Sequence, residues 1–177
     1  MMKRNILLLV MVLSGTVFLY PQEKPDKKKM REEKAEIAYE SMKQLIEGGK
    51  YLIVSDRLVS ARGYSKSIVT TPNYIQVEDG KANISLPYFG EVRANTPYMP
   101  DQGIKYEGPV QDYSMDLTDS KHRITVKFDI DRSIEEHNFI ITIGKSGQAR
   151  VKVISSGRTG ITYYGKVEPV AESTDRS

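Results

Sequence analysis

The sequence contains no cysteine and no tryptophan, and only two of its 177 residues are histidine. The lack of cysteine excludes disulfide bonds, thiolate zinc sites, iron–sulfur clusters and cysteine nucleophiles. His122 and His137 leave little material for a histidine-based metal site or a catalytic triad. The composition, 39% hydrophobic and 28% charged with a mean hydropathy of -0.44, excludes a polytopic membrane protein and a fully disordered chain.

The first twenty residues have the pattern of a secretory signal peptide. Lys3 and Arg4 precede an apolar run over residues 6–13, and small residues follow at positions 14–16. The apolar stretch then ends at Tyr20, which makes it shorter than the roughly 18 residues expected of a spanning helix. We expect residues 1–20 to direct export to the periplasm or the exterior. An uncleaved N-terminal anchor is the alternative, because no A-x-A cleavage pattern is present.

Removal of this signal changes the charge balance. The full chain has a formal net charge of +3, and Lys3 and Arg4 account for two of its 26 basic residues. The remaining 24 basic residues face 23 acidic ones, so residues 21–177 are nearly neutral. Nucleic-acid binding depends on concentrated positive charge, so we expect no nucleic-acid partner. We also expect no transmembrane span after the signal.

The remaining chain is predicted to form one domain. Residues 21–28 are expected to be a charged linker, residues 29–170 a single helix-plus-β domain, and residues 171–177 a flexible tail. A helix is expected from about Lys29 to Glu47, ended by Gly48-Gly49. Its buried stripe recurs at three- and four-residue spacing: Ala35, Ala38, Met42, Leu45 and Ile46.

The rest of the domain shows the alternation of β-strands. The predicted strands are 51–58, 67–71, 74–78, 81–86, 123–130, 139–143, 149–153 and 161–167. Asp79-Gly80 predicts a hairpin between the third and fourth of these. One apolar face and one wetted face indicate antiparallel sheet. The predicted fold class is mainly β (α+β): one N-terminal amphipathic helix followed by an antiparallel meander of eight or nine strands that curls toward a barrel or sandwich.

One segment, residues 87–103, breaks this rhythm. It contains three prolines, which exclude an inner strand, and long connections of this kind are uncommon unless they are functional or disordered. Its large apolar side chains argue against disorder. We therefore take four of them as candidate ligand-binding residues: Tyr88, Phe89, Tyr98 and Met99. The alternative is that these tyrosines simply fill the faces of a sheet.

No catalytic residue, metal site or cofactor is expected. Pairing of 121–130 with 136–145 would place His137 opposite Asp129 and leave the two histidines about 25 Å apart, too far to share a metal ion. Four acids gather near that turn, namely Asp129, Asp131, Glu135 and Glu136, and a solvated turn is favoured over a calcium site because their spacing matches no calcium loop. Asp101 and Asp112 are the acids that a hydrolase could use.

Several short blocks resemble an uncharacterised family of exported proteins from Bacteroidetes-type bacteria, a domain of unknown function. The blocks are Pro72-Asn73-Tyr74, Leu86-Pro87-Tyr88-Phe89-Gly90, Gly103-Ile104, Asp112-Tyr113, Arg123-Ile124-Thr125-Val126 and Ser155-Ser156 with Arg158. The resemblance spans roughly residues 30–168, and LPYFG is its most specific element. It implies an exported, mainly β protein with one leading helix, and it implies no activity.

These observations favour a non-enzymatic binding protein of the cell envelope that uses the 87–103 segment. Its partner would be an unknown small ligand or an envelope protein. A structural or protein-interaction module of the envelope is the alternative, and a hydrolase using Asp101 and Asp112 is less favoured.

Overall fold

The computed structural model describes residues 26–92, 103–132 and 135–170. The chain divides into two compact units, residues 1–30 and 31–177. The predicted signal peptide and the predicted tail, residues 171–177, lie outside the described residues, as do Tyr98, Met99 and Asp101. Among the described residues, no helix has both the length and the apolar character needed to span a membrane.

The α-helix α1 spans Lys27–Glu47 and starts two residues earlier than the sequence predicts. The Asp26 carboxylate accepts a hydrogen bond from the Lys28 backbone N–H at 2.9 Å, which caps the first turn. Gly49 has a φ of 67° and ends the helix in the left-handed conformation that glycine adopts without strain. Ala35 and Ile46 are buried as predicted, and Tyr39 joins them in the buried stripe.

In the part of the chain that the structure describes, ten antiparallel strands follow the helix, which confirms the predicted mainly β fold. They are β1 (Lys50–Ser60), β2 (Ser65–Ser67), β3 (Tyr74–Glu78), β4 (Lys81–Leu86), β5 (Ile104–Pro109), β6 (Gln111–Thr118), β7 (Arg123–Arg132), β8 (Glu135–Gly144), β9 (Gln148–Ser155) and β10 (Ile161–Pro169). A short 3-10 helix, η1 (Asp119–Lys121), connects β6 to β7.

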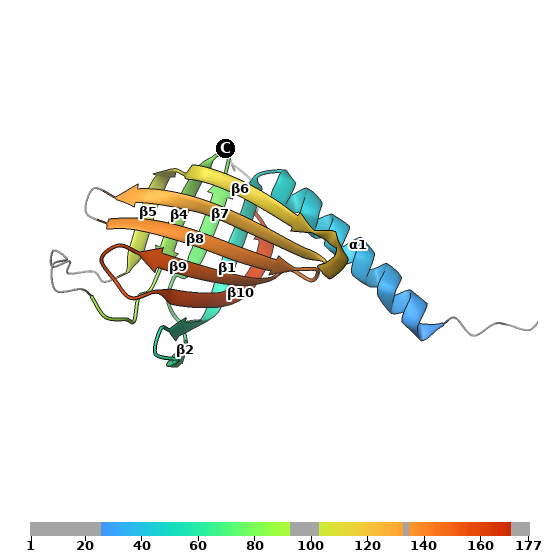
Figure 1. Ribbon diagram of the computed structural model, residues 1–177, viewed down its shortest axis with the longest axis horizontal. Coiled ribbons are helices and arrows are strands. Elements are labelled where there is room, and N and C mark those ends of the chain that lie inside the picture. Colours follow the sequence, from blue (N-terminus) through green and yellow to red (C-terminus); the bar gives the residue numbers. More distant parts are fainter. Residues whose placement is uncertain (1–25, 93–102, 133–134, 171–177) are drawn as a thin grey trace, which may run out of the picture. The chain divides into compact units, whose positions relative to one another are not determined.

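The strands form one sheet that curls into a nearly closed barrel. Their order is β5-β4-β3-β1-β10-β9-β8-β7-β6, with β2 paired to the side of β1. Neighbours follow the chain order except at β1–β3, where β2 comes between them in the sequence, and at β1–β10, where the first strand pairs with the last. The strands of the front layer, β6 to β10, cross those behind them at a steep angle (Figure 1). Among the described residues, β5 and β6 form the two ends of this order and do not pair with each other, which leaves an open seam between them.

The interior of the barrel is filled by side chains that alternate along each strand. Phe128 of β7 stacks on Phe139 of β8, with ring centroids 5.0 Å apart. Tyr51 and Tyr163 are fully buried. Burial raises the pKa of both phenols well above the ordinary value of 10. Tyr39 donates a hydrogen bond to Asp119 at 2.7 Å, and burial together with this carboxylate raises its pKa to about 12.

Two predictions about strands are wrong. Residues 67–71 do not form a strand, because only Ser67 pairs with β1. The chain turns there instead, and the side-chain amide of Asn73 donates hydrogen bonds to the carbonyls of Ile68 and Ser55 in place of a strand ladder. The pairing of β7 with β8 is also shifted by one residue, since His137 faces Ile130 and not Asp129. This register places Phe128 opposite Phe139, so that both apolar rows face the core.

The prediction of a solvated acidic turn fails for one of its four acids. Glu135 is buried, whereas Asp131 and Glu136 are exposed. Glu135 lies two residues before His137 and four before Phe139, so the alternation of β8 points all three side chains inward. A carboxylate at this position needs a buried counter-charge, which a distant part of the chain supplies.

Candidate binding site at the Tyr88–Val92 segment

The segment after β4 is fixed to the connection between β9 and β10. The Thr159 backbone N–H donates a hydrogen bond to the Glu91 carbonyl at 3.0 Å, and the Glu91 N–H donates one to the Thr159 hydroxyl at 3.1 Å. Val92 forms an isolated antiparallel bridge with Arg158. These bonds join residues more than sixty positions apart, so tertiary pairing sets the path of the segment.

Tyr88 lies in the core, where it supports the segment from below. Its hydroxyl is 2.9 Å from the Thr159 carbonyl oxygen and 3.1 Å from that of Glu91. A Cβ atom on Gly90 would lie 2.3 Å from this hydroxyl. Only glycine fits there, which gives a physical reason for the final residue of the LPYFG block.

Beneath Tyr88 lies a buried cluster of charged side chains. The Glu135 carboxylate is 2.9 Å from Nε of Arg158 and 3.5 Å from Nε2 of His137. All three side chains are at least 98% buried. His137 Nδ1 is 2.5 Å from the Ser155 hydroxyl, and the Arg158 guanidinium lies 5.0 Å from the Tyr88 ring. This arrangement places the positive charge of Arg158 against the Glu135 carboxylate and fixes Arg158 beside Tyr88. We therefore assign the cluster the role of stabilising the position of the Tyr88–Val92 segment.

The Phe89 side chain, unlike that of Tyr88, lies at the surface and is 45% exposed. The Lys66 ammonium lies 3.6 Å from the centroid of its ring. Glu91 forms an ion pair of 2.6 Å with Arg62, in the turn that follows β1. Gly63, with a φ of 85°, tightens this turn and presents Tyr64, which is 75% exposed.

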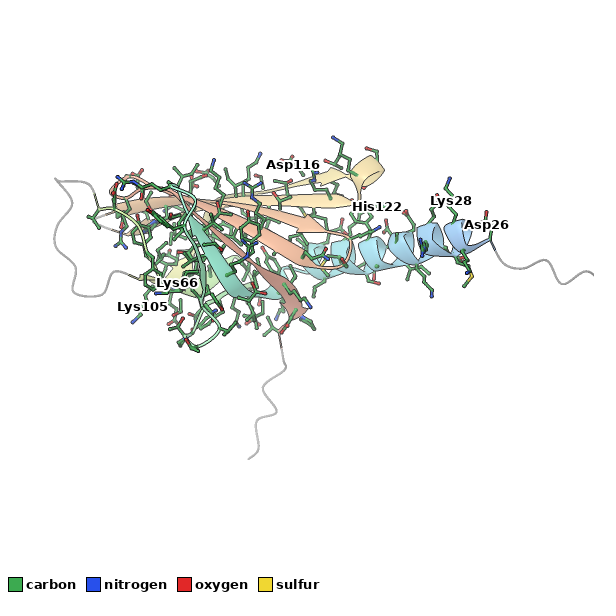
Figure 2. The ribbon with its side chains drawn as sticks, turned by 90° about the horizontal axis from the view of Figure 1, so that it is seen from below. Asp26, Lys28, Lys66, Lys105, Asp116 and His122 are labelled. Carbon is green, nitrogen blue, oxygen red and sulfur yellow. The ribbon has the colours of Figure 1, made fainter. Side chains whose placement is uncertain are left out.

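Together these residues surround an open depression of about 280 Å³, which we call the aromatic hollow. Its lining consists of Ser60, Ala61, Arg62, Tyr64, Phe89, Gly90, Glu91 and Thr159. Figure 2 shows Lys66 at the opposite end of the barrel from His122. The register of β7 with β8 places His122, just before β7, and His137, opposite Ile130, at opposite ends of this hairpin. Each histidine has an acidic neighbour, Glu36 at 2.8 Å from His122 and Glu135 at 3.5 Å from His137.

The predicted candidate residues therefore divide into three groups. Phe89 lines the aromatic hollow, Tyr88 supports it from the core, and Tyr98 and Met99 lie outside the described residues. Sequence reasoning did not find Arg62, Tyr64 or Lys66. The sequence pattern that could have pointed to them is the tight Arg-Gly-Tyr turn between β1 and β2. That turn lies near Phe89 only in the tertiary structure.

The less favoured catalytic acid that the structure describes, Asp112, lies elsewhere. It occupies a bulge in β6 with a φ of 50° and is exposed. No group of three or more histidine and carboxylate side chains among residues 26–92, 103–132 and 135–170 is arranged to hold a metal ion.

A family model described as a domain of unknown function, DUF4251, matches residues 33–167, which is most of the chain. The chain belongs to the DUF4251 family. A crystal structure of a DUF4251 family protein from Bacteroides eggerthii is similar, with a TM-score of 0.58 and 13% sequence identity. The match covers 75% of this chain and 88% of that one. At this identity the likeness supports the shared DUF4251 fold alone. No curated protein matches the chain.

Proposed function

We propose that this DUF4251 protein is an exported, non-enzymatic binding protein of the cell envelope and that its ligand contacts the aromatic hollow. The observation that carries the proposal is the exposure of Phe89 and Tyr64 around one depression on a hydrogen-bonded frame. Exposed aromatic rings on a fixed backbone supply a large contact area with little loss of side-chain entropy on binding.

The hollow favours a ligand that combines an apolar face with negative charge. Phe89 and Tyr64 supply the apolar contacts. Arg62 and Glu91 form an ion pair and offset each other's charge, so the Lys66 ammonium over Phe89 supplies the net positive charge. At about 280 Å³, the hollow is slightly smaller than the roughly 300–1,000 Å³ of sites that enclose a small molecule. We infer that it holds one part of a larger ligand.

The first test uses the dye anilinonaphthalenesulfonate, which is flat, aromatic and anionic. We expect it to bind the native protein with a rise in fluorescence, and we expect Phe89→Ala and Tyr64→Ala each to weaken binding about tenfold, through loss of about 1.4 kcal/mol of contact. Lys66→Gln should weaken binding less, and high salt should reproduce its effect.

Ile154→Ala is the matched control, since Ile154 is 43% exposed on β9 and does not line the hollow. Circular dichroism should confirm that each variant is folded. Equal dye binding by native protein, Phe89→Ala and Tyr64→Ala would remove the hollow from the proposal.

Export is a separate part of the proposal, supported by Lys3, Arg4 and the apolar run that follows them. We expect the full-length chain, expressed in a Gram-negative host, to accumulate in the periplasmic or culture fraction. A chain that begins at residue 21 should stay in the cytoplasm. N-terminal sequencing of the exported protein distinguishes a cleaved signal from an uncleaved anchor, and retention of both chains in the cytoplasm would contradict export.

A further inference from the structure

A second surface of the domain, the outer edge of β6, is open to solvent. β6 ends the strand order and pairs only with β7 among the strands that the structure describes. Six of its eight residues are exposed. In Figure 1, β6 is the outermost strand of the front layer. An exposed edge of this length presents backbone N–H and C=O groups to which another strand can bind.

The side of β6 that faces the barrel is apolar and only partly covered. Tyr113, Met115 and Leu117 alternate along the strand, and the last two face Val126 and Ile124 of β7. Tyr113 stacks on Phe128, yet it is 42% exposed, and Leu117 is 36% exposed. No strand among the described residues pairs with β6 on the side away from β7, although the Tyr113 hydroxyl lies 3.4 Å from the Tyr51 hydroxyl. A neighbouring strand with apolar residues at alternate positions would cover these apolar side chains.

The opposite side of β6 is acidic. Asp112 and Asp116 are both exposed, and Figure 2 shows Asp116 at the upper rim of the sheet. Asp116 forms an ion pair of 3.2 Å with Lys127 of β7, so the negative charge of this side comes mainly from the start of β6. Asp112 also lines an open depression of about 570 Å³ that continues from the start of β6 across β7 and β8. Three more carboxylates line it, from Asp129, Asp131 and Glu136. A strand added at this edge would therefore carry its outward side chains past negative charge.

We propose that the β6 edge accepts an extended segment of another protein in which apolar and basic residues alternate. The backbone of that segment would pair with β6, and its apolar residues would cover Tyr113, Met115 and Leu117. Its basic residues would approach Asp112 and the other carboxylates of the depression beside it. A second copy of this chain fits less well, because β6 itself has no basic residue to place beside Asp112. This inference goes beyond the proposed function, since the edge does not include the aromatic hollow.

The probe is an eight-residue peptide of alternating lysine and valine, blocked at both ends and labelled for fluorescence anisotropy. We expect it to bind the full domain at low salt, and we expect the alternating glutamate–valine peptide not to bind. Hydrogen exchange measured by mass spectrometry should slow across residues 111–118 when the lysine–valine peptide is added. The double variant Asp112→Asn with Asp131→Asn, which removes two exposed acids of the depression, should weaken binding about fivefold to tenfold.

Two controls separate strand addition from simple charge attraction. The double variant Asp56→Asn with Glu168→Gln removes two exposed acids from β1 and β10 and should leave binding unchanged. The second control uses two lysine–valine peptides, one with its odd-numbered amides N-methylated and one with its even-numbered amides N-methylated. Each peptide lacks the N–H donors along one of its two edges, so at least one of the two should fail to bind.

Three outcomes would overturn the inference. One is binding that neither N-methylated peptide changes, and another is binding that leaves exchange in 111–118 unchanged. The third is slower exchange in 111–118 that appears with rising protein concentration but not with peptide, which would assign the edge to a second copy of the chain.

Discussion

Above pH 10 the free energy of unfolding is expected to fall by about 2.7 kcal/mol for each further pH unit, until the protein unfolds cooperatively. The cause is that two buried phenols, Tyr51 and Tyr163, ionise only in the unfolded chain. Burial raises the pKa of both groups in the folded state. Their contribution is fully present below pH 10, the ordinary tyrosine pKa, and it decreases as the pH rises above that value. Tyr39, whose pKa is raised to about 12, adds to this loss up to that pH. A domain at the lower end of the usual range of about 5–15 kcal/mol is therefore expected to unfold by about pH 12.

The chain is well suited to this measurement, because it has eleven tyrosines and no tryptophan. Tyrosinate absorbance and far-ultraviolet circular dichroism should show one shared transition. The double variant Tyr51→Phe with Tyr163→Phe should reduce the dependence of the free energy of unfolding on pH. Gradual ionisation of all the tyrosines near pH 10 with no loss of circular dichroism would contradict the prediction.

Arg158→Met is expected to destabilise the fold by about 3–5 kcal/mol, since it leaves a buried carboxylate without its closest cation. Glu135 and Arg158 are fully or nearly fully buried and lie 2.9 Å apart. Removal of both charges, as in Glu135→Leu with Arg158→Met, should recover most of the loss, because an apolar pair avoids the free energy of burying ions. Urea unfolding of the native protein and both variants measures these differences.

Arg62→Met provides the matched control for this comparison. Arg62 pairs with Glu91 at 2.6 Å, but both side chains are more than half exposed, so we expect a change below about 1 kcal/mol. If Arg62→Met and Arg158→Met had equal effects, the buried cluster would not have the stabilising role assigned to it. The Glu135→Leu with Arg158→Met variant should also keep dye binding at the aromatic hollow.

Local signals in the sequence were enough to predict most of the strands. The hairpin of 74–78 with 81–86 forms as predicted, because Asp79-Gly80 fixes the turn and the alternation on both sides fixes the faces. The strands that form β7 to β10 were found for the same reason. The strands β5 and β6 were not predicted, although Tyr113, Met115 and Leu117 alternate as strand residues do.

The burial of Glu135 could also have been predicted from the sequence. It follows from the phase of His137 and Phe139, but acidic neighbours at 129, 131 and 136 favoured the solvated interpretation. The cation that makes burial possible, Arg158, lies in the connection after β9, and no local pattern links it to Glu135.

The sequence by itself determined the helix, the mainly β class and the irregular course of residues 87–90 after β4, because capping, alternation and proline content are local properties. Only the tertiary structure decided which aromatic residue of that segment is exposed. Tyr88 and Phe89 are adjacent in an irregular segment, so no periodicity indicates which of the two side chains is buried. Tyr88 is the buried one because its hydroxyl donates a hydrogen bond to the carbonyl of Thr159, 71 residues further along the chain. The open edge of β6 has the same origin, since the unpaired end of a sheet depends on how all the other strands pair.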